Sequence, residues 1–179
     1  MAITVLNPVQ EAVVEAVPLS PRLATLDGKT LGLFSNGKLN AGELLTLVGE
    51  RLAAEYRLAG IVRGTYAVSR AMEPGEWGAV DRCDAVVLAI GDCGSCSSSG
   101  VINCIQLERA GIPTMLVSTP PFAGVCRTMA ELGGVPDLDW AIVPHPIGSL
   151  GHEELVGRAD DAVAQFHRIV LERIDVLAS

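Results

Sequence analysis

The sequence predicts an α/β protein with a three-layer, flavodoxin-like or Rossmann-like fold and a mainly parallel sheet of about five strands. Strand-like apolar runs alternate with helix-like segments from residue 30 onward, and the links between them are short. Right-handed crossovers between such elements allow few topologies other than a parallel sheet covered on both faces. The chain is 49% hydrophobic but only 4% aromatic, so its core must consist of aliphatic side chains, as is typical of such sheets.

The first elements follow from turn residues and hydrophobic spacing. Residues 1–28 show no period, and we expect an N-terminal arm there that packs on the body or on a partner subunit. A single α/β domain is expected over 29–179. Its first half should contain a strand over 30–34 after the Asp27-Gly28 turn, a helix over 41–56 with leucines at helical spacing, a strand over 60–67, and a short helix over 73–80 with Pro74 in its first turn.

The second half begins with the clearest strand, residues 84–90, which is continuously apolar and should be buried on both faces. A helix over 100–110 is expected next, because Gly111 and Pro113 would end it. The remaining elements are predicted as a strand over 113–118, a helix over 122–132, a strand over 140–143 and a long helix over 152–177.

Three polar segments are predicted to meet at one edge of the sheet. Residues 35–40, 92–99 and 144–148 each follow a predicted strand. In open parallel sheets, ligands bind beyond the carboxyl ends of the strands. The sequence therefore predicts a functional site at this edge.

Cys93 and Cys96 carry the chemistry expected at that site. They stand in the segment Gly-Asp-Cys-Gly-Ser-Cys, just before a predicted helix. The partial positive charge of a helix N-terminus favours a thiolate and lowers its pKa. Two cysteines at this spacing could form a reversible disulfide, so that one thiolate attacks and the other resolves the adduct. Ser95 and Ser97 could hydrogen-bond a substrate carboxylate.

Three plainer interpretations compete with reactive thiols. A structural zinc site needs four ligands, but the chain has no second cysteine pair and only three scattered histidines, so no metal is expected. A phosphate-binding loop would need a nucleotide-loop pattern that residues 91–100 lack. Inert buried cysteines suit Cys83, Cys104 and Cys126 better than the pair in the Gly/Ser-rich segment.

These motifs resemble the small bacterial family named for its Sec/Cys-Gly-Ser-Cys motif, in which some members carry selenocysteine at the position of Cys93. The resemblance extends over nearly the whole chain. It comprises Leu26-Asp27-Gly28-Lys29, Asn36-Gly37-Lys38 with Asn40, Gly91-Asp92-Cys93-Gly94-Ser95-Cys96, Glu108-Arg109-Ala110-Gly111-Ile112-Pro113, and Pro144-His145-Pro146-Ile147-Gly148.

Segments 93–113 and 144–148 are also distantly similar to the selenoprotein B subunits of glycine, sarcosine and betaine reductases. In those proteins a selenolate attacks the carbon beside a carboxylate and displaces an amine. The resemblance implies that Cys93 is the nucleophile and Cys96 its redox partner. This chain departs from the subunits in having cysteine at 93 and Ser99 where they have another cysteine, and it is far shorter.

Further candidate residues lie in the other two polar segments and after the fourth strand. His145, between two prolines, is a candidate general acid or base, or else a structural residue of the turn. Asn36, Lys38 and Asn40 are predicted to bind substrate, and the alternative for Asn36 and Lys38 is an Asn-Gly turn with a solvated lysine. Thr119 and Phe122 are predicted to bind substrate as part of the pocket wall.

Charge and composition limit the kinds of partner that the protein is expected to have. A net charge of −8 argues against nucleic acid, whose phosphates require a basic surface. No signal peptide or membrane-spanning run is evident, so we expect a cytoplasmic protein with free thiols, no bound cofactor, and an external thiol or thioredoxin-like reductant. A small-molecule substrate is expected, with a partner subunit or a homo-oligomer as further options.

The expected function is a thiol-dependent enzyme. Cys93 would attack a small, carboxylate-bearing substrate, and Cys96 would resolve the adduct, with reductive cleavage of a carbon–nitrogen or other carbon–heteroatom bond. Two alternatives stay open: a lyase or transferase that uses Cys93 without net redox change, and a non-catalytic subunit that presents a ligand to a larger complex.

Overall fold

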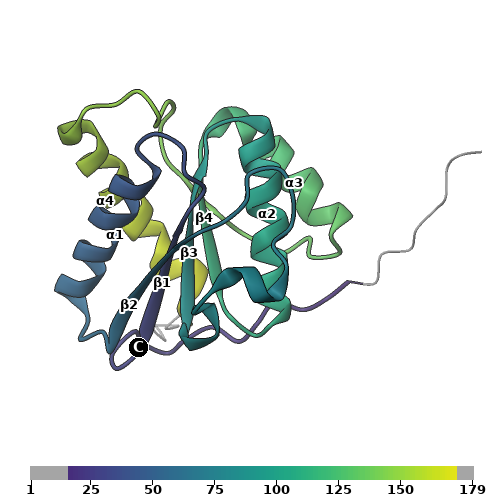
Figure 1. The fold of residues 1–179 in the computed structure, drawn as a ribbon, viewed down its shortest axis with the longest axis horizontal. Helices are drawn as coiled ribbons and strands as arrows, with labels where there is room; N and C mark the ends of the chain where they lie inside the picture. Colours follow the sequence, from purple (N-terminus) through teal and green to yellow (C-terminus); the bar gives the residue numbers. More distant parts are fainter. Residues whose placement is uncertain (1–15, 173–179) are drawn as a thin grey trace, which may run out of the picture.

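Five parallel strands form the centre of the computed structural model, which describes residues 16–172 (Figure 1). The sheet has the strand order β2-β1-β3-β4-β5, which is the order of flavodoxin-like doubly wound folds. The predicted fold class is thus confirmed. The strands are β1 (Thr30–Ser35), β2 (Gly60–Thr65), β3 (Ala85–Gly91), β4 (Thr114–Ser118) and β5 (Ala141–Ile142).

Two layers of helices cover the sheet. Helices α1 (Ala41–Glu55) and α4 (His152–Val170) lie on one face, and α2 (Gly94–Arg109) and α3 (Ala123–Leu132) lie on the other (Figure 1). Every residue of β3 is buried. Because side chains alternate along a strand, Val87 and Ala89 join the core beneath α1 and α4, whereas Val86 and Leu88 join the core beneath α2 and α3. No helix within residues 16–172 is long and apolar enough to cross a bilayer.

Several predicted boundaries were wrong. Helix α2 begins at Gly94 rather than at residue 100, because serines that suggest a loop instead bond back onto helix carbonyls, as Ser98 Oγ does onto the Gly94 oxygen at 2.9 Å. The predicted helix over 73–80 is two short 3₁₀ helices, η1 (Pro74–Trp77) and η2 (Val80–Arg82), separated at Gly78, where φ is +61°. Helix α4 ends at Val170, and residues 173–177 of its predicted extent lie outside the described chain.

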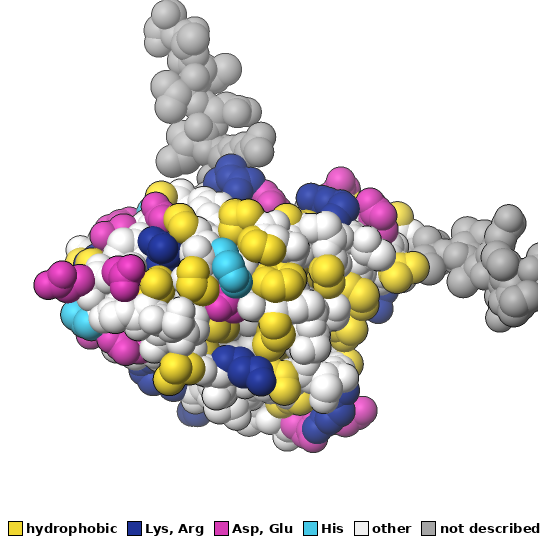
Figure 2. Space-filling model, turned by 90° about the horizontal axis from the view of Figure 1, so that it is seen from above, with side chains coloured by type: hydrophobic (Ala, Val, Ile, Leu, Met, Phe, Trp, Pro, Cys, Tyr) yellow, Lys and Arg dark blue, Asp and Glu magenta, His cyan; other side chains and the backbone are white. Residues whose placement is uncertain are grey.

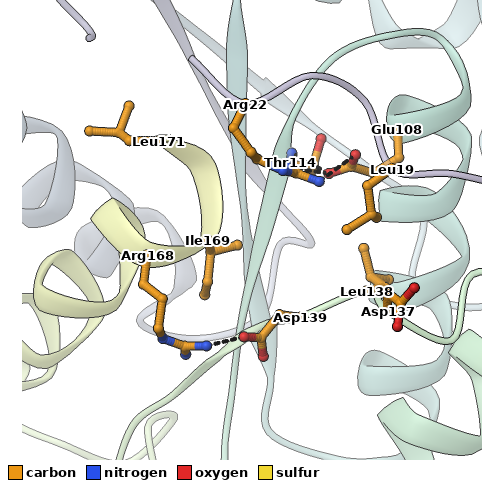
Figure 3. A pocket seen from close by; sticks show the side chains of 10 residues that line it. All are labelled: Leu19, Arg22, Glu108, Thr114, Asp137, Leu138, Asp139, Arg168, Ile169 and Leu171. Carbon is orange, nitrogen blue, oxygen red and sulfur yellow. Dashed lines mark hydrogen bonds and ion pairs between the residues drawn. The ribbon is translucent and has the colours of Figure 1, made fainter. Parts of the chain in front are cut away.

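A buried carboxylate attaches the described part of the N-terminal arm to the body. Glu108, at the end of α2, is only 3% exposed. It forms a bidentate ion pair with Arg22 at 2.9 Å and accepts from both the backbone and the hydroxyl of Ser20. It also accepts from the Thr114 N–H at the start of β4. Arg22, Glu108 and Thr114 border a cavity of about 320 Å³ (Figure 3). Through Glu108, residues 20–22 are thus held at the amino-terminal edge of the sheet, where β4 begins.

Candidate active site

A small cavity opens at the carboxyl-terminal edge of the sheet, where the sequence predicts a site. All three polar segments meet there, since Asn40 bonds to the carbonyls of Ile147 and Leu150, and Asp92 bonds to the backbone of residues 147 and 148. Figure 2 looks onto this edge and shows hydrophobic side chains gathered over its middle. The cavity measures about 280 Å³ and is lined by Lys38, Leu39, Ile90, Asp92, Cys93, Cys96 and Gly148.

Cys93 is the N-cap residue of α2. Its backbone is extended, with φ −158° and ψ 166°, and its sulfur accepts a hydrogen bond of 3.3 Å from the Cys96 N–H. The N–H groups of Gly94 and Ser95 open the same helix and have no acceptor inside it, because the first turn of a helix lacks preceding carbonyls. The Cys93 sulfur therefore sits at the positive end of the α2 dipole, facing the cavity.

The pKa of Cys93 lies below the ordinary value of a thiol. Desolvation alone would raise it, but hydrogen bonds from the Cys96 thiol, the Ser95 hydroxyl and the Cys96 backbone outweigh that effect. The positive charge of Lys38 lowers the pKa of Cys93 further. A lowered pKa increases the thiolate fraction at neutral pH, and the thiolate is the nucleophilic form.

Cys96 has the opposite character. Its sulfur lies 2.6 Å from that of Cys93, and its side chain is buried in the first turn of α2. Burial raises its pKa to about 11, and the neighbouring Cys93 sulfur raises it as well. Cys96 therefore stays protonated at neutral pH, whereas Cys93 ionises more readily than an ordinary thiol. Both sulfurs border the cavity, so a molecule bound to Cys93 would remain within reach of Cys96.

Asp92, the residue before the nucleophile, connects β3 to the 144–148 turn. Its Oδ2 accepts from the backbone N–H groups of Ile147 at 2.9 Å and Gly148 at 3.0 Å. Its Oδ1 lies 2.8 Å from Nδ1 of His145 and accepts from the Thr119 hydroxyl at 3.3 Å. Asp92 was not among the predicted site residues, although an acidic residue directly after a buried strand was a usable signal.

His145 is placed beside the cavity rather than in its wall. Its ring is held by Asp92 and packs edge-on against Phe122, with centroids 5.9 Å apart. Thr119 is fully buried and bonds to Asp92 and to the Gly91 carbonyl. The structure thus brings three predicted residues, His145, Thr119 and Phe122, together around Asp92, but none of them lines the cavity.

The other predicted substrate-binding residues divide into two groups. Lys38 lines the cavity, and the Ser95 hydroxyl lies 3.5 Å from the Cys93 sulfur, so both can reach a ligand. The amide of Asn36 instead donates to the Ile90 carbonyl, and that of Asn40 donates to two carbonyls of the 147–150 segment. Ser97 is completely buried. The two asparagine side chains thus support the backbone of the site, and none of these last three residues lines the cavity.

The remaining cysteines are buried thiols of the core. Burial raises the pKa of Cys83 to about 11 and raises the pKa values of Cys104 and Cys126. These three therefore stay protonated and have little exposed surface. Within residues 16–172, no three His, Cys, Asp or Glu side chains are close enough together to hold a metal ion.

Comparison with known protein families identifies the family of the chain. The model of the UGSC family matches residues 4–172, which is nearly the whole chain. No curated protein matches the sequence. The matched region contains both cysteines, the Asp92 junction and the 144–148 turn, and the chain belongs to the UGSC family.

Proposed function

We propose that the protein is a thiol-dependent enzyme in which Cys93 forms a covalent adduct with a small, carboxylate-bearing substrate and Cys96 resolves it. One observation carries the proposal: a cavity-lining thiol with a lowered pKa touches a second thiol whose pKa is raised. The lowered pKa suits Cys93 as the nucleophile, and the contact between the two sulfurs suits Cys96 as the group that attacks the adduct after losing its proton.

The cavity supports a small anionic substrate. Its volume of about 280 Å³ is at the lower limit of ligand pockets, which suits a molecule of few heavy atoms. Lys38 is the cation among the described residues that line it, while the oxygens of Asp92 are occupied by protein donors. The unpaired N–H groups at the start of α2 add donors for a carboxylate or a developing oxyanion.

The first step forms a carbon–sulfur bond. The Cys93 thiolate attacks the carbon beside the carboxylate, and the amine or other heteroatom group departs with the bonding electron pair and takes up a proton. A thioether on Cys93 results. No net oxidation has occurred at this stage, because the sulfur replaces one heteroatom substituent with another.

The second step transfers two electrons to the substrate. Cys96 gives up its proton and its sulfur attacks the Cys93 sulfur, so the sulfur–carbon bond breaks. The carbon keeps the electron pair and takes up a proton, and a Cys93–Cys96 disulfide forms. An external dithiol, such as a thioredoxin-like protein, reduces this disulfide and is itself oxidised to a disulfide.

A lyase or transferase is the second candidate. A pKa of about 11 leaves little Cys96 thiolate at neutral pH, which disfavours the resolving step. In this alternative, water or another nucleophile displaces the substrate from Cys93, and no reductant is consumed.

Intact-protein mass spectrometry tests the proposal. The protein is incubated with α-amino, α-hydroxy and α-halo carboxylates, with and without a dithiol. We expect Cys96→Ser to accumulate an adduct with the mass of the substrate minus its leaving group, and Cys93→Ser to form none. Cys83→Ser is the matched control, because that thiol is buried and precedes β3 whereas Cys93 follows it, and the variant should behave as wild type.

The outcomes separate the candidates. Turnover that requires the dithiol and is lost in Cys96→Ser supports the reductive reaction. Turnover without any reductant, undiminished in Cys96→Ser, supports the lyase or transferase instead. Full turnover in Cys93→Ser would refute both.

A further inference from the structure

The Asp92 carboxylate is anchored more firmly than a surface ion pair requires. Its side chain is 13% exposed, and both oxygens are engaged. Two backbone N–H groups occupy Oδ2, while the Thr119 hydroxyl and the His145 ring share Oδ1. Every one of these partners can donate a hydrogen bond, which suits an acceptor-only carboxylate.

We propose that Asp92 is a positioning residue that holds His145 with its proton on Nδ1, so that Nε2 is the atom that exchanges protons during turnover. Nδ1 lies 2.8 Å from the anchored Oδ1, and because a carboxylate oxygen accepts hydrogen bonds, a contact of this length favours a proton on Nδ1. In a neutral imidazole, a proton on Nδ1 leaves Nε2 as the free acceptor. Nε2 forms no hydrogen bond to residues 16–172, and the side chain is 40% exposed.

The other two histidines show what a plain surface pair looks like. His152 pairs with Glu43 and His167 with Glu55, and both carboxylates are 45% exposed. Neither of those carboxylates accepts a backbone N–H within the described chain. Phe122 further confines the His145 ring from one side. The ring beside the cavity is thus the one whose orientation is fixed by a carboxylate that is itself fixed.

This inference rests on the proposed function for its chemical purpose. The leaving heteroatom group needs a proton in the first step, and Cys96 must lose one in the second step. Nε2, which is free in the resting ring, can take the proton that the Cys93 thiol releases and pass it to the leaving group. In the second step it can take the Cys96 proton and pass it to the substrate carbon, so the ring returns to its starting state. Asp92 acts in this cycle only by orienting the ring.

The tautomer can be measured without any substrate. Long-range ¹H–¹⁵N spectra distinguish Nδ1–H from Nε2–H imidazoles, and the chain has only three histidines, so His145→Gln assigns the signals. We expect the Nδ1–H form for His145 in the wild type and its loss in Asp92→Asn. Glu43→Gln, which removes the carboxylate from Nδ1 of His152, is the matched control and should leave His145 unchanged. An Nε2–H form in the wild type would overturn the proposal.

A kinetic measurement tests the role in catalysis. Asp92→Asn should lower kcat by about 10²- to 10⁴-fold, the usual contribution of a positioned proton-transfer group, with KM changed only a few-fold. The rate of Cys93 alkylation by iodoacetamide in this variant should stay within about twofold of the wild-type rate, because the hydrogen bonds that lower the Cys93 pKa come from Cys96 and Ser95. An unchanged kcat, or equal loss of turnover and alkylation through collapse of the site, would overturn the proposal.

Two safeguards keep the test decisive. If Asp92→Asn does not fold, His145→Gln removes the same ring from an exposed position and should reproduce the fall in kcat with normal alkylation. If the wild type turns over no substrate, the proposed function fails, whereas the tautomer spectra still decide whether Asp92 orients the ring.

Discussion

The sulfur of Cys93 lies 2.6 Å from the sulfur of Cys96, and the contact divides the two thiols into an acidic and a weakly acidic partner. Cys93 caps α2 and accepts from the Cys96 N–H, and once Cys93 is ionised its sulfur can also accept from the Cys96 thiol, which is buried in the first turn of the helix. The order of the two residues therefore decides which sulfur ionises, because only the first can receive the N–H groups of the helix start.

Replacing Cys96 should make Cys93 less reactive. Cys96→Ala removes the thiol donor that lowers the pKa of Cys93, so this pKa should rise. The midpoint of the alkylation rate against pH should move upward, and the rate at pH 7 should fall several-fold, since one pKa unit changes the thiolate fraction about tenfold. Iodoacetamide kinetics between pH 5 and 10 measure this. A midpoint that is unmoved or lower would contradict the assigned hydrogen bond.

Removing the Lys38 charge should alter both reactivity and selectivity. Lys38→Met should raise the pKa of Cys93 and should slow iodoacetate more than iodoacetamide, because only iodoacetate is an anion. We expect the ratio of the two rate constants to fall several-fold at low salt. Lys29→Met is the matched control, since Lys29 pairs with Asp84 at the other edge of the sheet. Equal effects of the two substitutions would rule out a specific role for Lys38.

Breaking the ion pair between Glu108 and Arg22 should lower the free energy of unfolding. Glu108→Gln leaves Arg22 without its carboxylate, and loss of one partner of a buried pair typically costs about 3–5 kcal/mol. The partial exposure of Arg22 and the retained amide oxygen place the expected loss nearer 2 kcal/mol. Urea unfolding measures this loss of unfolding free energy. The control is Glu131→Gln on the exposed side of α3, whose unfolding free energy should stay within about 0.5 kcal/mol of the wild-type value. A decrease in unfolding free energy no larger than that of the control would contradict a stabilising role for the Glu108–Arg22 pair.

Two helical glycines should respond oppositely to alanine. At Gly100 an added Cβ would lie 2.7 and 2.8 Å from the two Leu116 methyl groups, so Gly100→Ala should cost about 1–3 kcal/mol through overpacking. At Gly157 the same atom meets open space, and Gly157→Ala should gain up to about 1 kcal/mol of helix propensity. Thermal unfolding of both variants checks the contrast. A stabilised Gly100→Ala would show that α2 can move away from the sheet.

Much of the fold could be predicted because burial leaves a simple pattern. The apolar run that became β3 is buried on both faces, and such a run has few other interpretations. The start of α2 was misplaced by six residues, since glycine and serines are weak helix formers and the capping sulfur of Cys93 is visible only in three dimensions. The break at Gly78 depends on a positive φ that a sequence does not state.

The sequence could predict where the candidate site lies, but not which contacts each of its side chains makes. Parallel topology brings residues 35–40, 92–99 and 144–148 to one edge, so the sequence could place Cys93, Lys38 and His145 near one another there. Asn36 and Asn40 were expected to bind substrate, but their amides bond to backbone carbonyls. A polar residue in a loop looks the same in sequence whether it faces a ligand or a neighbouring strand, and hydrogen bonds across 50 or 100 residues leave no local signal.

Helix α2 has the Cys93 sulfur at its start and Glu108, which pairs with Arg22, near its end. Its 16 residues span about 24 Å, so a single rigid rod joins the two edges of the sheet. A change that frees Arg22 therefore loosens the far support of the element whose first turn tunes the sulfur. We therefore expect changes at residues 20–22 to affect the pKa of Cys93 through helix α2 rather than across the protein surface.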